Sequence, residues 1–282
     1  MESEFNMKKV VISSLLTVVA LSSLAGVSNA AQVGSAAKSK ASVDFTTGNE
    51  NPKPYDPSKP DGPVTEVEER PTDQGKGTTG QLRFDRVPTF AFETITIGDA
   101  DQKSNVLQES YTVKGTSETF YSAPSLEISD IRGSNTGWSV LVKKDAELKS
   151  STTTTPAITG YKLTLAKGVV RTYSEGNQSG APVFKSIEIG TETNAFLNAA
   201  AGSGGASWAL NFFDESVASE VGEDAKTGST VKVPVKNTTD TPTASSAVTL
   251  EIPQGATMKT GETYSTNLTW ILSDDPSATT TP

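Results

Sequence analysis

The residue types that most often carry enzymatic chemistry are either missing from this chain or stand in no catalytic pattern. The 282 residues include no histidine and no cysteine, which excludes Cys/His zinc sites, cysteine nucleophiles and histidine general bases. Carboxylate pairs that could serve a glycosidase occur by chance among the 33 Asp and Glu residues, but a solvated surface position is the usual place for each. We therefore expect a protein that is not an enzyme and that uses no cofactor.

Two local patterns resemble chemical motifs, and both fail. The Asp-x-Asp at 99–101 is similar to the start of a calcium loop, but Lys103 occupies the fifth position and Ser110 the twelfth. The Ser-x-x-Lys pattern at 35–38 lies in a polar region with no predicted element that could position a nucleophile. We expect neither a metal site nor a catalytic serine.

The charge balance bounds the class of partner. The chain carries 24 Lys and Arg against 33 Asp and Glu, a net charge of −9, and its isoelectric point is near 4.7. A polyanion would be repelled by this excess of negative charge, so no nucleic-acid partner is expected.

The first 30 residues have the three parts of a secretory signal peptide. Two lysines, Lys8 and Lys9, precede an apolar run over 10–21, and Ser28-Asn29-Ala30 supplies a small-x-small cleavage site. Met7 begins a typical signal peptide, so residues 1–6 before it are either an earlier start or a non-native extension. The apolar run is short for a membrane span, so we expect secretion with no membrane insertion after cleavage.

The C-terminal residues, 273–282, contain no hydrophobic stretch and no Leu-Pro-x-Thr-Gly sorting signal. An exported chain without cysteine is typical of Gram-positive bacteria. The expected location is therefore outside the cell, either released or held non-covalently at the cell wall or cell surface.

A low-complexity linker is predicted over residues 31–80. Six prolines lie between Asn51 and Pro71, interleaved with charged residues, and the Gly-rich stretch 75–80 follows them. Proline fixes φ and removes a hydrogen-bond donor, so the stretch should be extended, solvated and disordered. The weak alternation at 41–46 is compatible with one isolated strand that joins the downstream body.

Residues 81–282 are predicted to form one all-β domain, an antiparallel β-sandwich of the Greek-key type. Apolar residues alternate with polar ones in many short runs, which are separated by Gly, Asn, Asp, Ser and Pro. The candidate strands are 82–87, 90–97, 106–113, 125–129, 138–143, 161–165, 169–173, 184–189, 207–213, 231–235, 248–252 and 264–272. One alanine-rich run, 194–201, predicts a short surface helix.

Each of the three tryptophans is followed two residues later by an aliphatic residue. The pairs are Trp138 with Val140, Trp208 with Leu210, and Trp270 with Leu272. On a strand the two members of each pair share a face, but parity does not say whether that face is the core or an exposed platform for sugars or a partner. Both interpretations stay open at this stage.

The order of these segments resembles the WxL-domain cell-surface proteins of Gram-positive bacteria. An acidic Pro-rich linker is followed by Gly80–Phe92 (GQLRFDRVPTFAF), by Gly137–Val142 (GWSVLV), and finally by Tyr264–Leu272 (YSTNLTWIL). The resemblance covers the chain from about residue 43 to the end. Val140 stands where the motif has leucine, and the extra Trp-Ala-Leu at 208–210 is expected to be core.

The resemblance implies non-covalent attachment to peptidoglycan, together with partners from the WxL-interacting family and other surface proteins. Carried over by motif, the expected binding residues are Trp138, Val140, Tyr264, Leu268, Trp270 and Leu272. The leading hypothesis is thus a non-enzymatic wall-binding protein. The alternative is a protein-interaction subunit of a surface complex that is recruited by an anchored partner.

Overall fold

A computed structural model describes residues 40, 42–44, 46, 51, 53–58, 65–68, 75–152, 155–173, 180–223, 229–239 and 241–278. The chain divides into two units, residues 1–44 and 45–282, and the description below concerns the second. The predicted signal peptide and most of the predicted linker lie outside the described residues. Among the residues that are described, no helix has the length and apolar character needed to cross a membrane.

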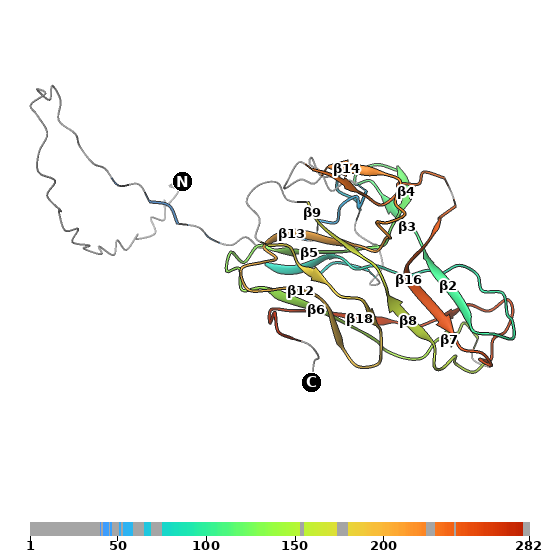
Figure 1. The fold of residues 1–282 in the computed structure, drawn as a ribbon. Helices are drawn as coiled ribbons and strands as arrows, with labels where there is room; N and C mark the ends of the chain where they lie inside the picture. Colours follow the sequence, from blue (N-terminus) through green and yellow to red (C-terminus); the bar gives the residue numbers. More distant parts are fainter. Residues whose placement is uncertain are drawn as a thin grey trace, which may run out of the picture. The chain divides into compact units, whose positions relative to one another are not determined.

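Three four-stranded sheets make up most of the described body, and every strand pairing in them is antiparallel (Figure 1). The first sheet has the order β1 (Leu82–Arg86), β5 (Ser125–Asp130), β13 (Ala206–Asn211) and β9 (Val169–Thr172). The second has the order β10 (Val183–Phe184), β12 (Asn194–Ala199), β6 (Trp138–Lys144) and β18 (Leu268–Ser273). The third has the order β11 (Ile187–Glu188), β8 (Lys162–Leu165), β16 (Ala244–Ile252) and β2 (Gln102–Leu107).

Three two-stranded antiparallel pairs complete the described strands. They are β3 (Glu109–Thr112) with β4 (Thr119–Ser122), β7 (Lys149–Ser150) with β17 (Tyr264–Ser265), and β14 (Val221–Glu223) with β15 (Thr230–Lys232). The pair β7–β17 matters for the site below, because it fixes the backbone of Tyr264.

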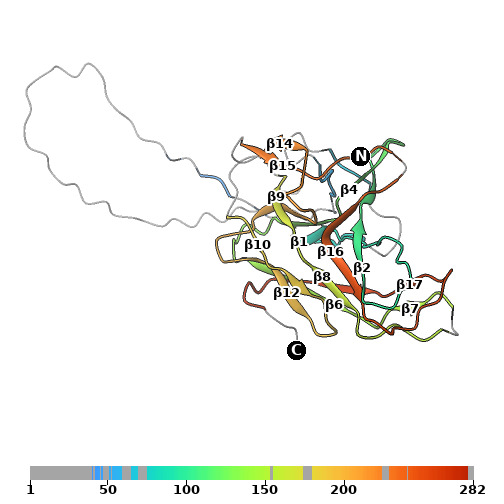
Figure 2. The same ribbon diagram turned by 45° about the vertical axis from the view of Figure 1, so that its right-hand side comes forward.

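One hydrophobic core is shared by the three large sheets. Figures 1 and 2 show the first sheet above the second. Alternate residues of each strand point into the space between them, for example Leu126 and Ile128 of β5, which are 0% and 1% exposed. Trp138 and Phe196 enter the same core from the second sheet, and Leu163 enters it from the third. This alternation is the period-2 pattern that the sequence displays.

The predicted all-β antiparallel class is confirmed, because the described elements are strands paired antiparallel. The predicted helix at 194–201 is wrong. Residues Asn194–Ala199 form β12, which hydrogen-bonds to β10 on one side and to β6 on the other. Burial of Phe196 and Leu197 in the core, together with pairing along both edges, outweighs the helix propensity of the alanines.

The predicted strand at 90–97 is also wrong in its extent. Only Phe92 makes an isolated bridge, to Val106, and the following residues are mostly exposed. Residues 42–44 and 46, the described part of the possible strand at 41–46, form no strand. Residues 91–93 lie beside β2, since Leu107 N donates to Ala91 O at 2.8 Å and Glu93 N donates to Asn105 O at 3.1 Å, but the pairing does not extend into a regular strand.

Two segments of the predicted linker, 53–58 and 65–68, pack against the β-body. Val67 is fully buried in a small cluster with Tyr111 and Phe120. Tyr55 stacks on Tyr173 with ring centroids 5.3 Å apart. This part of the proline-rich region is therefore integrated into the fold.

Candidate functional site: an aromatic pocket beside the distal tryptophan

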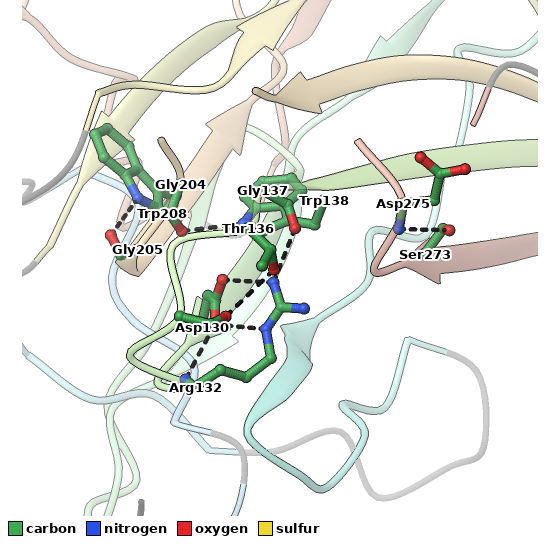
Figure 3. A network of polar contacts seen from close by, with 11 residues as sticks. Asp130, Arg132, Thr136, Gly137, Trp138, Gly204, Gly205, Trp208, Ser273 and Asp275 are labelled. Carbon is green, nitrogen blue, oxygen red and sulfur yellow. Dashed lines mark hydrogen bonds and ion pairs between the residues drawn. The ribbon is translucent and has the colours of Figure 1, made fainter. Parts of the chain in front are cut away.

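The first tryptophan motif lies inside the core. Trp138 and Val140, both on β6, are 0% exposed. The indole Nε1 of Trp138 donates a hydrogen bond to the carbonyl oxygen of Gly204 at 3.0 Å (Figure 3). A buried indole usually finds such a partner, and here the bond ties β6 to the loop before β13. Neither side chain has exposed surface with which to touch a ligand.

Trp208 hydrogen-bonds to the next residue of the same loop, Gly205. It is 4% exposed, as expected for a core residue, and its Nε1 donates to the Gly205 carbonyl at 2.8 Å (Figure 3). Gly204 has φ of 77°, and a Cβ there would lie 2.5 Å from Nε1 of Trp138. Only glycine fits against the indole, so the two tryptophans and this loop pack as one unit.

A charged clamp supports the turn that leads into Trp138. The Arg132 guanidinium donates to both carboxylate oxygens of Asp130, at 2.9 and 2.7 Å. It also donates to the carbonyl of Gly137 at 2.9 Å (Figure 3). The hydrogen bonds from Arg132 thus hold the residue before the tryptophan in place. The contacts around the first motif are structural.

The second tryptophan motif lies on the adjacent strand. Strand β18 is at the edge of the second sheet and pairs with β6 in a register that sets Leu272 opposite Val140 and Trp270 opposite Val142. The two motifs are therefore neighbours in space. Unlike Trp138, the side chain of Trp270 is only half-buried, as are those of Leu272, Leu268 and Tyr264.

Three of these distal residues, Tyr264, Leu268 and Trp270, line an open pocket of about 470 Å³. We name it the aromatic pocket. Further aromatic lining comes from Phe84, Phe90 and Phe92, all within the segment Gly80–Phe92, and from Tyr161. The remaining lining residues are Gly75, Lys76, Thr78, Val87, Pro88, Thr89, Leu148, Leu163, Leu250, Ser265, Thr266 and Asn267. Leu272 is not among them.

The indole of Trp270 is held from two sides. Its ring centroid lies 6.1 Å from that of Phe90 and 5.6 Å from that of Phe196, in both cases edge to face. Phe90 in turn packs edge to face on Phe212 at 5.4 Å. These contacts pre-organise the aromatic wall before any ligand arrives.

The rim at Tyr264 is fixed by a polar cluster around Glu262. The Glu262 carboxylate accepts hydrogen bonds from the hydroxyls of Ser150, Thr152 and Thr155, and Lys259 forms an ion pair with it at 2.9 Å. These donors, the Ser150 hydroxyl first, lower the pKa of Glu262 to about 2. Backbone pairing of Tyr264 with Ser150 joins the same loops.

The pocket offers hydrogen-bonding groups beside its aromatic faces. Thr78, Thr89, Ser265, Thr266 and Asn267 contribute hydroxyl or amide groups. Among the described residues that line it, Lys76 is the only charged one. Within the part of the chain that is described, acidic side chains form no cluster of three that could hold a metal ion. The arrangement suits binding of a small amphipathic group.

The six motif residues thus separate into two groups. Tyr264, Leu268 and Trp270 come together around the pocket, whereas Trp138 and Val140 lie in the core and Leu272 packs beside them. The sequence reasoning named no site residue in the segment Gly80–Phe92. The signal was the alternation Pro88-x-Phe90-x-Phe92, which supplies one wall.

A family model described as "WxL domain surface cell wall-binding" matches residues 32–276, nearly the whole chain. The chain belongs to this WxL family. The suspected resemblance is thereby confirmed, and the WxL domain places the protein at the cell surface as a wall-binding protein. No curated protein and no solved structure matches this WxL protein.

Proposed function

We propose that this WxL protein is a secreted, non-enzymatic protein that attaches non-covalently to peptidoglycan through the aromatic pocket. One observation carries the proposal: two of the family-like segments, Gly80–Phe92 and Tyr264–Leu272, converge on the same open cavity. The first contributes Phe90, and the second contributes Tyr264 and Trp270. These segments stand more than 170 residues apart in the sequence. If these segments served only core packing, they would not need to line an open cavity together.

The pocket's chemistry suits the glycan of peptidoglycan. A pyranose ring presents an apolar face of C–H groups and a rim of hydroxyl and acetamido groups. Phe90, Tyr264 and Trp270 supply aromatic surface for the face, and Asn267 and Thr266 supply polar groups for the rim. A volume of about 470 Å³ lies within the usual range for small-ligand pockets.

A second function, docking to another surface protein, is favoured by the position of β18. This strand is the last in its sheet and pairs with β6 along one edge. An open strand edge offers backbone donors and acceptors to a partner strand. Surface proteins of the WxL-interacting family are the proposed partners in this case.

Salt dependence distinguishes pocket binding from attraction by charge. Purified protein should sediment with insoluble Gram-positive walls, and raising NaCl should preserve or strengthen retention. The reason is that a chain of net charge −9 is repelled by anionic wall polymers, and salt screens this repulsion. If charge attraction drove binding, Lys143 and Lys144 would be the candidate basic patch. Lys144 is already paired with Glu147, at 3.4 Å.

Recovery of all the protein in the supernatant at low and at moderate salt would refute the wall-binding proposal. Loss of retention as salt rises would instead indicate a basic binding surface. If pulldown from a cell extract returns a surface protein and no wall material, the docking function replaces the glycan function.

A further inference from the structure

The segments 53–58 and 65–68, which we call the latch, cover the polar face of the first sheet. They pair with each other, since Asp56 N donates to Thr65 O and Val67 N donates to Pro54 O, both at 2.9 Å. The second segment also continues the β3–β4 pair: Glu68 N donates to Thr112 O at 2.8 Å, and Lys114 N donates to Glu66 O at 3.0 Å. The latch is therefore attached along a strand edge as well as over a sheet face.

The face beneath the latch is polar and sealed from water. Strand β5 directs Leu126 and Ile128 into the hydrophobic core, and the residues that alternate with them, Ser125, Glu127 and Ser129, point to the opposite side. Glu127 is 1% exposed, and Asp85, next to it on β1, is 2% exposed. Burial of acidic side chains to this degree is costly unless they are neutral or fully paired.

The latch contacts these two carboxyl groups directly. The backbone N–H of Tyr55 donates to Glu127 Oε2 at 2.8 Å, and that of Lys53 donates to Asp85 Oδ1 at 3.0 Å. Lys236, from the body, forms an ion pair with buried Asp56 of the latch at 3.3 Å. Asp85 also pairs with Arg83 at 2.9 Å, so its negative charge is compensated.

The charge of Glu127 is less well compensated. Its surroundings are Asp85 and Arg86 of β1, Glu109 and Tyr111 of β3, Ser125 of β5, Tyr173 after β9, and Tyr55 of the latch. Arg86, the one cation among them, is in contact with Glu109 at 3.3 Å. Ser125 Oγ donates to Glu127 Oε1 at 2.7 Å. Burial outweighs these favourable contacts and raises the pKa of Glu127 to about 8.

We propose that the latch is a proton-dependent device, which stays closed over the first sheet while Glu127 is protonated and opens as Glu127 ionises. Opening gives the carboxylate access to water, where an ionised glutamate is at its most stable. Closing needs a proton on Glu127, because Arg86, the one cation among the described groups around it, pairs with Glu109 and does not offset the burial of the carboxylate.

The pH window follows from linkage. In the open state Glu127 titrates near its ordinary value of 4.5, and in the closed state near 8. Below pH 4.5 both states hold the proton, so the latch is most firmly closed there. Between these values opening releases a proton, so the opening constant rises up to about tenfold for each pH unit and then levels off above pH 8.

Single cysteines test this directly, because the chain has no other thiol. Val67→Cys places a thiol on the latch itself, at a fully buried position, and Val217→Cys places a control thiol at a position that is 77% exposed. Dithiodipyridine labelling rates are measured from pH 5 to pH 8. The ratio of the Val67→Cys rate to the control rate should rise about 400-fold, and it should stay flat when Glu127→Gln is added.

A flat ratio in the presence of native Glu127, or an equal rise in the Glu127→Gln background, would overturn the proposal. Should Val67→Cys fail to fold, hydrogen exchange of the Tyr55 amide in the unmodified chain replaces it, after correction for the intrinsic pH dependence of exchange. Protection that falls from pH 5 to pH 8 supports the latch, and constant protection contradicts it.

Discussion

Replacing Trp138 with alanine is expected to destabilise the protein by about 3–5 kcal/mol, the usual cost of removing a fully buried tryptophan. The substitution leaves a cavity between β6 and the loop at Gly204, and it leaves the Gly204 carbonyl without its 3.0 Å hydrogen bond. Urea denaturation followed by circular dichroism measures the change. Wall retention should fall only as far as the folded fraction falls.

The conservative variant Trp138→Phe provides the control. It keeps one aromatic ring and much of the apolar volume, but it loses the indole N–H and part of the bicyclic ring system, so we expect a cost of about 1–3 kcal/mol. If Trp138→Ala instead abolished wall binding at unchanged stability, Trp138 would be a ligand contact, and the structural role given to the first motif would be wrong.

Raising the pH from 5 to 8 is expected to lower the stability of the folded protein by a few kcal/mol through Glu127. The pKa of Glu127 is about 8 in the fold and about 4.5 when the chain is unfolded. Because the folded pKa is the higher one, the unfolded state loses its proton first, and stability is lost between these two values. Opening of the latch limits the loss, since an open latch hydrates the carboxylate.

Glu127→Gln should remove most of this pH dependence, as measured by urea denaturation at pH 5, 6.5 and 8. Glu262 offers a contrast. Hydrogen bonds lower its pKa to about 2, so its stabilising contribution is present above pH 4.5 and is lost only as pH falls toward 2. If the free energy of unfolding changes equally with pH in Glu127→Gln and in the native chain between pH 5 and 8, Glu127 is not the titrating group.

Alternation along the chain predicted the strands well, because a half-buried strand needs an apolar side chain at every second position. Alternation did not show which face of a strand lies in the core and which face is exposed. Trp138 and Trp270 carry the same local pattern, yet one is in the core and the other borders a pocket. The difference arises from position in the sheet: β6 is central, whereas β18 is at the edge.

Long-range contacts explain what the sequence did not reveal. The alanine-rich run at β12 became a strand because it lies between two strand partners, and neither partner is encoded locally. The sequence did not predict the latch, because its prolines indicated an extended, solvated linker. Pro54 donates no hydrogen bond, yet its carbonyl accepts one from Val67, and Tyr55 packs on Tyr173. A Pro-rich composition alone therefore does not exclude a packed segment.

The two tryptophan motifs of this WxL protein have different roles in one structure. The first fixes the core and the glycine loop, and the second lines the pocket on the strand next to it. Direct pairing of Leu272 with Val140 links the two. Packing around Trp138 should therefore be needed to position Trp270 at the pocket. Contacts to the wall ligand are expected at the pocket and not at the first motif.

The most direct test is wall retention of Tyr264→Ala, compared with Tyr121→Ala as a matched control. Both tyrosines are half-buried on two-residue or four-residue strands, but only Tyr264 lines the aromatic pocket. If the pocket binds the wall, Tyr264→Ala should weaken retention by roughly 30-fold, corresponding to about 2 kcal/mol, while Tyr121→Ala binds normally. Equal retention by a correctly folded Tyr264→Ala variant and by the native protein would contradict the account.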